Sequence, residues 1–131
     1  MATKRILVVD DDSYVRGATE EILIRKGYDV DTASAASGAL QKLDEGEYDL
    51  LLSDIKMPGM SGLELLGKVK TKWPELTVIL MTAYSSVEDA VRAMKDGAYD
   101  YIQKGSESTT AETEIVVERA LKFQETEREN R

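Results

Sequence analysis

The stretch YDLLLSDIKMPGMSG, residues 48–62, decides how the rest of the chain is interpreted. Its leucines, residues 50–52, form a short apolar run that is typical of a strand buried on both faces of a sheet. Asp54 follows this run, and the proline, glycines and serine after it are typical of a turn. In an open parallel sheet, ligands bind at the carboxyl ends of the strands. The position of Asp54 therefore makes it a candidate functional residue.

The composition narrows the class of protein. A chain of 131 residues is long enough for one domain with a hydrophobic core. The formal net charge of -8 argues against direct binding of nucleic acid or of an anionic membrane through the overall electrostatic field. The chain has no Cys and no His, which excludes disulfides, thiol chemistry, imidazole bases and His-ligated metals. Carboxylates, hydroxyls and lysines remain for chemistry.

The amino-terminal segment does not resemble a targeting sequence. Its basic start, MATKR, is followed by a short apolar segment that runs directly into Asp10, Asp11 and Asp12. No apolar run in the chain approaches the roughly 20 residues that span a bilayer. We therefore expect a cytoplasmic protein.

Strand-like runs and helical patterns alternate five times along the chain. The strands are expected at residues 6–9, 28–33, 50–52, 76–81 and 99–102. The helical patterns run from a cap at Asp12 or Ser13 to Gly27, from Ala36 to Gly46, from Leu65 to Trp73, from Val87 to Met94, and from Ala111 past Leu121. No hairpin signal separates the strands, so parallel pairing through right-handed crossovers is expected. The predicted fold is α/β: a doubly wound, five-stranded parallel sheet with five helices in a flavodoxin-like, three-layer arrangement.

Polar residues stand where four of the predicted strands end. They are the aspartates at 10–12, Ser53 with Asp54, Thr82 and Lys104. Carboxylates held close together raise one another's pKa unless a cation lies between them. Oxygen donors without His or Cys favour Mg²⁺ or Ca²⁺, and an incomplete protein shell favours Mg²⁺ with a phosphoryl substrate. A lysine and a threonine at the same edge can hold the oxygens of a phosphoryl group on Asp54.

Four separate blocks carry a resemblance to a known family: ILVVDDDSYVR, LLLSDIKMPGMSGLELL, VILMTAY and GAYDYIQK. In this order and spacing they resemble the receiver domain of two-component response regulators, over nearly the whole chain to about Leu121. GAYDYI and the preceding AVRAMKDG are most similar to receivers of the nitrogen-regulation class. Such receivers precede an ATPase module that activates an alternative sigma factor.

The resemblance implies a phosphoacceptor and a magnesium site. Asp54 would accept a phosphoryl group from the phosphohistidine of a sensor histidine kinase. Asp12, Asp54 and the backbone carbonyl of Lys56 would bind Mg²⁺, and Asp11 would help through a water. Asp10 is expected to be structural or secondary, because the next two acids would do the metal work.

The resemblance also implies a switch. Thr82 would close on the phosphoryl oxygen, Lys104 would pair with it, and Tyr101 would turn inward as Thr82 moves. Lys56 and Tyr84, two residues beyond Asp54 and Thr82, would flank the approach of the attacking water. The domain would catalyse only its own phosphorylation and dephosphorylation, so no enzyme acting on a metabolite is expected.

One feature departs from the family pattern. Receivers usually have a Pro after the Lys of the fifth strand, whereas Gly105 follows Lys104 and the connection to the last helix is a residue or two longer. Since Gly permits many conformations, this loop is predicted to be more mobile and Lys104 less firmly aimed.

The expected organisation is a receiver domain at residues 1–122 and the start of a helical linker at 123–131. The charged tail LKFQETERENR favours helix, and the linker would lead to an output domain with ATPase and DNA-binding modules. A solvated, frayed terminus is the alternative interpretation of this tail. A second copy of the chain is a further candidate partner.

Two other functions are alternatives to the receiver interpretation, and each meets an obstacle in the sequence. A small Mg²⁺-dependent phosphatase with an aspartate nucleophile is suggested because Asp10–Asp12 loosely resemble the DxD motif of haloacid-dehalogenase enzymes. Tyr14 stands where that motif has Thr or Val, and the chain is too short for a substrate-covering cap. An FMN carrier would need a Gly- and hydroxyl-rich phosphate loop after the first strand, where three aspartates would repel the phosphate.

Overall fold

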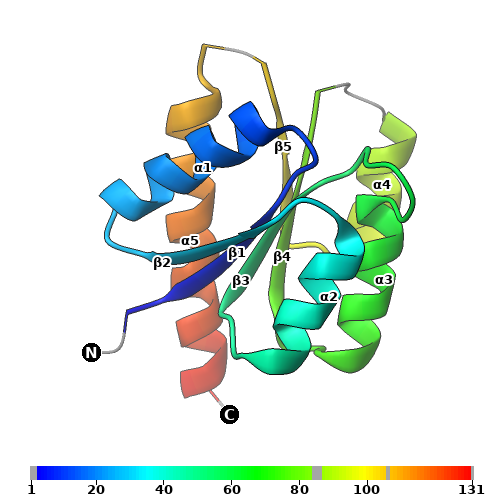
Figure 1. The fold of residues 1–131 in the computed structure, drawn as a ribbon. Helices are drawn as coiled ribbons and strands as arrows, with labels where there is room; N and C mark the ends of the chain where they lie inside the picture. The colour runs from blue at the N-terminus through cyan, green and yellow to red at the C-terminus, as the bar shows by residue number, and fades with distance from the viewer. Residues whose placement is uncertain (1–2, 84–86, 106, 131) are drawn as a thin grey trace.

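The computed structural model describes residues 3–83, 87–105 and 107–130. Five strands and five helices alternate along this part of the chain (Figure 1). They are β1 (Arg5–Val9), α1 (Ser13–Arg25), β2 (Asp29–Ala33), α2 (Ala36–Glu45), β3 (Leu50–Asp54), α3 (Gly62–Lys72), β4 (Thr77–Thr82), α4 (Val87–Lys95), β5 (Asp100–Gln103) and α5 (Thr109–Glu129). Among these, no helix is both long enough and apolar enough to cross a membrane.

The strands form one parallel sheet in the order β2-β1-β3-β4-β5. The predicted doubly wound, five-stranded α/β fold is therefore confirmed. The order places β3 at the centre of the sheet, with β1 on one side and β4 on the other. All carboxyl ends of the strands meet at one edge, which we call the carboxyl edge, and all amino ends meet at the opposite amino edge.

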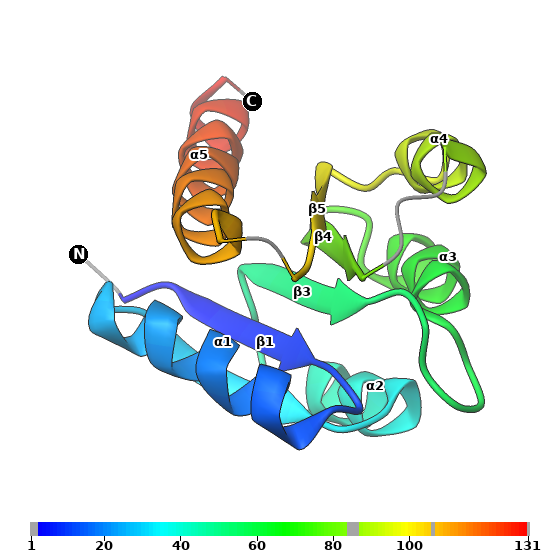
Figure 2. The same ribbon diagram turned by 90° about the horizontal axis from the view of Figure 1, so that it is seen from above.

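Helices cover both faces of the sheet, which gives the predicted three layers (Figure 2). Leu50 and Leu52 belong to one hydrophobic core, into which α1 and α5 pack, and Leu51 belongs to the other, into which α2, α3 and α4 pack. All three leucines are 0% exposed. The apolar run in β3 is thus buried on both faces, as the sequence indicates.

The start of α3 lies against the end of β3. Ser61 caps α3 in a reciprocal pair with Glu64, and the backbone N–H of Gly62 donates to the carbonyl of Ile55 at 2.7 Å. A Cβ atom on Gly62 would lie 2.2 Å from the carbonyl oxygen of Asp54, which no side chain tolerates. Glycine is therefore required here, and its close packing holds the loop that follows Asp54.

Helix α5 continues without a break through residue 123, where the helical linker is expected to start, to Glu129. Gln124 is 5% exposed, and its side-chain amide donates to the carbonyl of Asp49 at 2.7 Å and to the hydroxyl of Thr77 at 3.0 Å. Arg128 lies 3.7 Å from the carboxylate of Asp49. Residues 123–128 are thus helical, and two of them, Gln124 and Arg128, contact residues at the amino edge.

Candidate functional site

Three carboxylates meet at the carboxyl edge. Oxygen atoms of Asp10, Asp11 and Asp54 all lie within 4.8 Å of one another. The register pairs Val9 of β1 with Ser53 of β3, so Asp10 and Asp54, the next residues along, lie level on neighbouring strands. Asp10 and Asp54 are 3% and 7% exposed, whereas Asp11 is exposed. The group is therefore open to solvent on one side.

Lys104 joins these acids from the end of β5. Its Nζ lies 3.0 Å from Oδ2 of Asp10 and 3.3 Å from Oδ2 of Asp54. Its backbone N–H donates to the carbonyl of Thr82 at 2.7 Å. Lys104 is thus held by its backbone and by its side chain in this structure, and the predicted mobility of the loop that follows it stays a prediction. Gly105 has a φ of +89°, a conformation closed to the Pro that the family usually has here.

The electrostatics of the site depend on the balance of these four groups. Burial raises the pKa of Asp54 above its ordinary value, the charge of Lys104 lowers it, and the charges of Asp10 and Asp11 raise it again. Burial alone would lower the pKa of Lys104, but its hydrogen bond with Asp10 and the charge of Asp54 raise it. One ammonium faces three carboxylates, so the site retains an excess of negative charge that suits a divalent cation.

The structure gives Asp12 a different place from the one expected. Its Oδ1 accepts hydrogen bonds from the backbone N–H groups of Tyr14 at 2.9 Å and Val15 at 3.2 Å, so Asp12 caps α1. The cap predicted for Asp12 or Ser13 is therefore Asp12. Among the described acids, the group around Asp54 contains Asp10 and not Asp12. The group of acids that the structure brings together thus includes Asp10, and the expected metal ligand Asp12 lies outside it.

Asp10, which the sequence interpretation set aside, is tied into the site by several bonds. Its backbone N–H donates to the carbonyl of Ala33 at 3.2 Å, which continues the pairing of β1 with β2 by one residue. Its Oδ1 accepts from the N–H of Asp12 at 3.0 Å, and its carbonyl accepts from Arg16 at 2.8 Å. The sequence did contain a signal for this role. Asp10 directly follows the apolar run of β1, as Asp54 follows the apolar run of β3.

The other expected site residues come from neighbouring elements. Thr82 is the last residue of β4 and is 1% exposed, and it lies one residue beyond Met81, the register partner of Asp54. Lys56 is exposed in the loop after β3. Tyr101 in β5 is half-buried against the core under α2, α3 and α4. Tyr84 lies outside the described residues.

Comparison with known proteins places the chain in a family. A family model of the response regulator receiver domain matches residues 6–115. The chain belongs to this family. The response regulator FleR of Pseudomonas aeruginosa is 41% identical over 121 residues, which is 92% of this chain and 25% of FleR. The transcriptional regulator NtrC of Escherichia coli K12 is 42% identical over 116 residues, 88% of this chain and 24% of NtrC. The predicted similarity to the nitrogen-regulation class is confirmed, and the chain spans about a quarter of these relatives.

Solved receivers share the whole architecture. A receiver from Methanospirillum hungatei superimposes with a TM-score of 0.90 at 36% identity, over 96% of this chain and 99% of that one. TrrA of Thermotoga maritima, solved with Mg²⁺ and BeF, gives 0.81 at 38% identity over 90% and 99%. The beryllofluoride-activated dimer of the NtrC4 receiver gives 0.86 at 30% identity over 93% and 98%. The fold of this chain is that of these receivers.

Proposed function

We propose that this domain is a phosphorylation-dependent signalling switch that accepts a phosphoryl group on Asp54 from a sensor histidine kinase. The observation that carries the proposal is the group of three carboxylates, Asp10, Asp11 and Asp54, with Lys104 within 3.3 Å of Asp54. A buried acid with one cation and two acidic neighbours can exchange a phosphoryl group when a metal balances the charge.

The proposed metal is Mg²⁺, because the donor set consists of carboxylate oxygens. Asp10, Asp11 and Asp54 would hold it, together with the backbone carbonyl of Lys56 in the loop after β3. When bound, Mg²⁺ supplies positive charge that neutralises the phosphoryl oxygens. The similar receiver TrrA was solved in complex with Mg²⁺ and BeF, which supports this assignment.

The residues of this chain would perform the transfer as follows. A carboxylate oxygen of Asp54 forms a bond to phosphorus while the phosphorus–nitrogen bond of the kinase phosphohistidine breaks, and the electron pair stays on that nitrogen. Asp54 attacks as a carboxylate; burial raises its pKa, and the charge of Lys104 opposes that effect. Lys104 and the Thr82 hydroxyl would then bind the phosphoryl oxygens, and Tyr101 would turn inward. Attack of water on phosphorus would then break the bond between phosphorus and the Asp54 oxygen, release inorganic phosphate and restore the carboxylate.

The output of the switch is proposed from the relatives. NtrC is named a DNA-binding transcriptional regulator, and this chain matches about a quarter of it. We propose a transcriptional output domain joined through a linker that continues α5, with the domain boundary beyond the contacts of Arg128. The activated dimer of the NtrC4 receiver supports a second copy of this chain as a partner after phosphorylation.

The test is phosphorylation by acetyl phosphate with Mg²⁺, read by intact mass. The wild type should gain one phosphoryl group, and chelation of Mg²⁺ should prevent the gain. Asp54→Asn should abolish it with an unchanged fold, while Asp44→Asn, which removes an exposed carboxylate on α2, should leave it intact. Labelling of Asp54→Asn would contradict the assignment. Catalytic hydrolysis of an added phosphate ester would favour the phosphatase alternative instead.

A further inference from the structure

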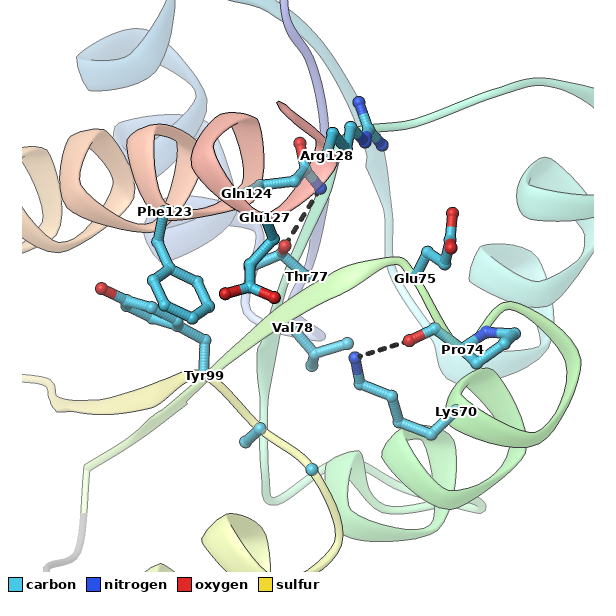
Figure 3. Close-up of a pocket in the computed structure, with 12 residues that line it drawn as sticks. Lys70, Pro74, Glu75, Thr77, Val78, Tyr99, Phe123, Gln124, Glu127 and Arg128 are labelled. Atoms are coloured by element: carbon cyan, nitrogen blue, oxygen red, sulfur yellow. Dashed lines mark hydrogen bonds between the residues drawn. The ribbon is translucent and has the colours of Figure 1, made fainter. Parts of the chain in front are cut away.

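A cavity of about 460 Å³ lies at the amino edge, at the opposite end of the strands from Asp54 (Figure 3). Thr77 and Val78 of β4 line it, together with Tyr99 before β5, Lys70 near the end of α3, and Phe123 and Glu127 of α5. Its volume is in the range of small-molecule sites, roughly 300–1,000 Å³. Nothing in the receiver chemistry of Asp54 uses this cavity.

Lys70 places a half-buried ammonium in this cavity. Its stem crosses Gly97, where a Cβ atom would lie 3.4 Å from Lys70 Cγ. Its Nζ donates to the carbonyl of Leu76 at 2.6 Å and reaches that of Pro74 at 3.4 Å. Among the described residues, no carboxylate lies within 4.0 Å of this ammonium. Two carbonyls use two of its three N–H donors and leave its charge without a counterion.

The comparison with Lys104 shows what Lys70 lacks. Both lysines are partly buried, but Lys104 meets two carboxylates, those of Asp10 and Asp54. Burial lowers the pKa of Lys70, with no acidic group to oppose it. A half-buried cation without a counterion is stabilised by any anion that reaches it.

An aromatic wall faces this ammonium across the cavity. The ring centroids of Tyr99 and Phe123 lie 5.6 Å apart, and Phe123 is 53% exposed despite its size. Figure 3 shows these two rings on one side of the cavity, the Lys70 ammonium on the other, and Val78 between them. The two sides thus suit a molecule with a flat apolar body and an anionic group.

We propose that this cavity binds a small aromatic carboxylate, with its carboxylate on the Lys70 ammonium and its ring against Tyr99 and Phe123. The carboxylate fills the free donor of Lys70 with a charge-assisted hydrogen bond. The ring packs on the aromatic pair and covers the exposed face of Phe123. Glu127 points its carboxylate towards the cavity in Figure 3 and opposes an anion there.

The test uses phenylacetate, titrated into the full chain by calorimetry and by amide chemical shifts. Phenylacetate should bind about tenfold more tightly than neutral 2-phenylethanol, and shifts should concentrate at Gly97, Ala98 and Phe123. Lys70→Gln should weaken binding about tenfold. Lys68→Gln, which removes an exposed charge from the same helix, should change it little.

Two further variants keep the test independent of Lys70. Phe123→Ala truncates an exposed ring and should weaken phenylacetate several-fold, and Glu127→Gln should strengthen it because a repelling charge is removed. Equal binding of phenylacetate and 2-phenylethanol, equal losses in Lys70→Gln and Lys68→Gln, or no saturable binding would each overturn the proposal. Asp54→Asn, which tests the phosphoacceptor separately, should leave this binding unchanged.

Discussion

Charged side chains at the two edges of the sheet differ in their burial and in their partners. At the carboxyl edge, the ammonium of Lys104 contacts Asp10 and Asp54, and Asp11 lies in the same group of acids. At the amino edge, Arg5 meets the carboxylates of Asp29 at 3.4 Å and Asp31 at 2.8 Å, and the backbone N–H of Arg5 donates to Asp49 at 2.8 Å. The acids that Arg5 meets at the amino edge are thus partly exposed, whereas Asp10 and Asp54 at the carboxyl edge are buried and lie in a group with a third carboxylate.

This difference separates the charges of ordinary ion pairs from those of the candidate functional site. A matched, largely exposed ion pair contributes little to stability and needs nothing from outside. A buried group with excess negative charge costs stability until a cation binds, and such sites are where function concentrates. Presence of charge is common to both edges, so the balance of charge is the informative quantity.

The largest expected effect breaks the charge balance at the carboxyl edge. Lys104→Met should lower the free energy of unfolding by about 2–3 kcal/mol without Mg²⁺, because Asp10 and Asp54 lose their shared cation while buried. Lys122→Met, which removes an exposed partner of Glu118 at 3.5 Å, should cost at most about 0.5 kcal/mol. Urea denaturation measures both values. Adding Mg²⁺ should restore more stability to Lys104→Met than to the wild type, and equal losses in the two variants would remove the distinction between buried and exposed charges.

A second prediction concerns the backbone that holds the carboxyl edge. Gly62→Ala should destabilise the fold by about 1–3 kcal/mol, since its Cβ would overlap the Asp54 carbonyl. The same change at Gly67, an exposed position of α3 with nothing within 4 Å, should stabilise by about 0.5–1 kcal/mol. Thermal unfolding compares the pair. Two changes of the same sign would show that helix propensity, and not the close approach, governs residue 62.

At the amino edge, Gln124→Met should cost only about 1 kcal/mol. The variant loses the bonds to Asp49 and Thr77, but it also removes Oε1, a buried oxygen with no hydrogen-bond partner among the described residues. Gln41→Met, at an exposed site on α2, should change stability by less than about 0.5 kcal/mol. Denaturant midpoints measure both losses of stability. A loss as large as that of Lys104→Met would show that polar contacts at the two edges contribute equally to stability.

The smallest effect is a pH dependence at the amino edge. Burial and the hydrogen bond to Asp31, at 2.6 Å, raise the pKa of Tyr48 to about 12. The unfolded chain ionises this tyrosine near pH 10, so its contribution is complete below pH 10 and is lost as the pH rises to about 12. Screening limits the effect to about 1 kcal/mol or less. The stability difference between wild type and Tyr48→Phe should shrink between these pH values, and a constant difference would argue against the raised pKa.

Much of the fold could be predicted from the sequence because apolar runs and helix boundaries are local signals. Asp54, Thr82 and Lys104 could be brought together because parallel strands share a carboxyl edge. The sequence could not show which of Asp10, Asp11 and Asp12 lie beside Asp54, since this depends on where β1 stops pairing and α1 starts. The bond from Asp10 to Ala33 extends the strand pairing by one residue, which leaves Asp12 to cap the helix.

Composition alone also could not predict how the tail packs. Its charged sequence is typical of a solvated helix, yet Gln124 lies on the stripe that Val117, Ala120 and Leu121 bury against the sheet. A polar residue on an apolar stripe was the signal. The hydrogen-bond partners of Gln124 are the carbonyl of Asp49 and the hydroxyl of Thr77 at the amino edge. Tertiary packing brings them together, and no local sequence pattern shows it.

Helix α5 spans the distance between the two edges and is hydrogen-bonded near both. Its 21 residues make a rod about 30 Å long. One end is fastened beside the Lys104 loop, where the Thr109 hydroxyl donates to the carbonyl of Gln103 at 3.3 Å, and the other is clamped by Gln124. A rigid-body tilt of this helix would therefore change the contacts at both ends. Under the proposed function, a molecule that binds the amino-edge end of α5 more tightly in the phosphorylated form would shift the equilibrium of Asp54 towards phosphorylation, and phosphorylation would raise the affinity for that molecule by the same factor.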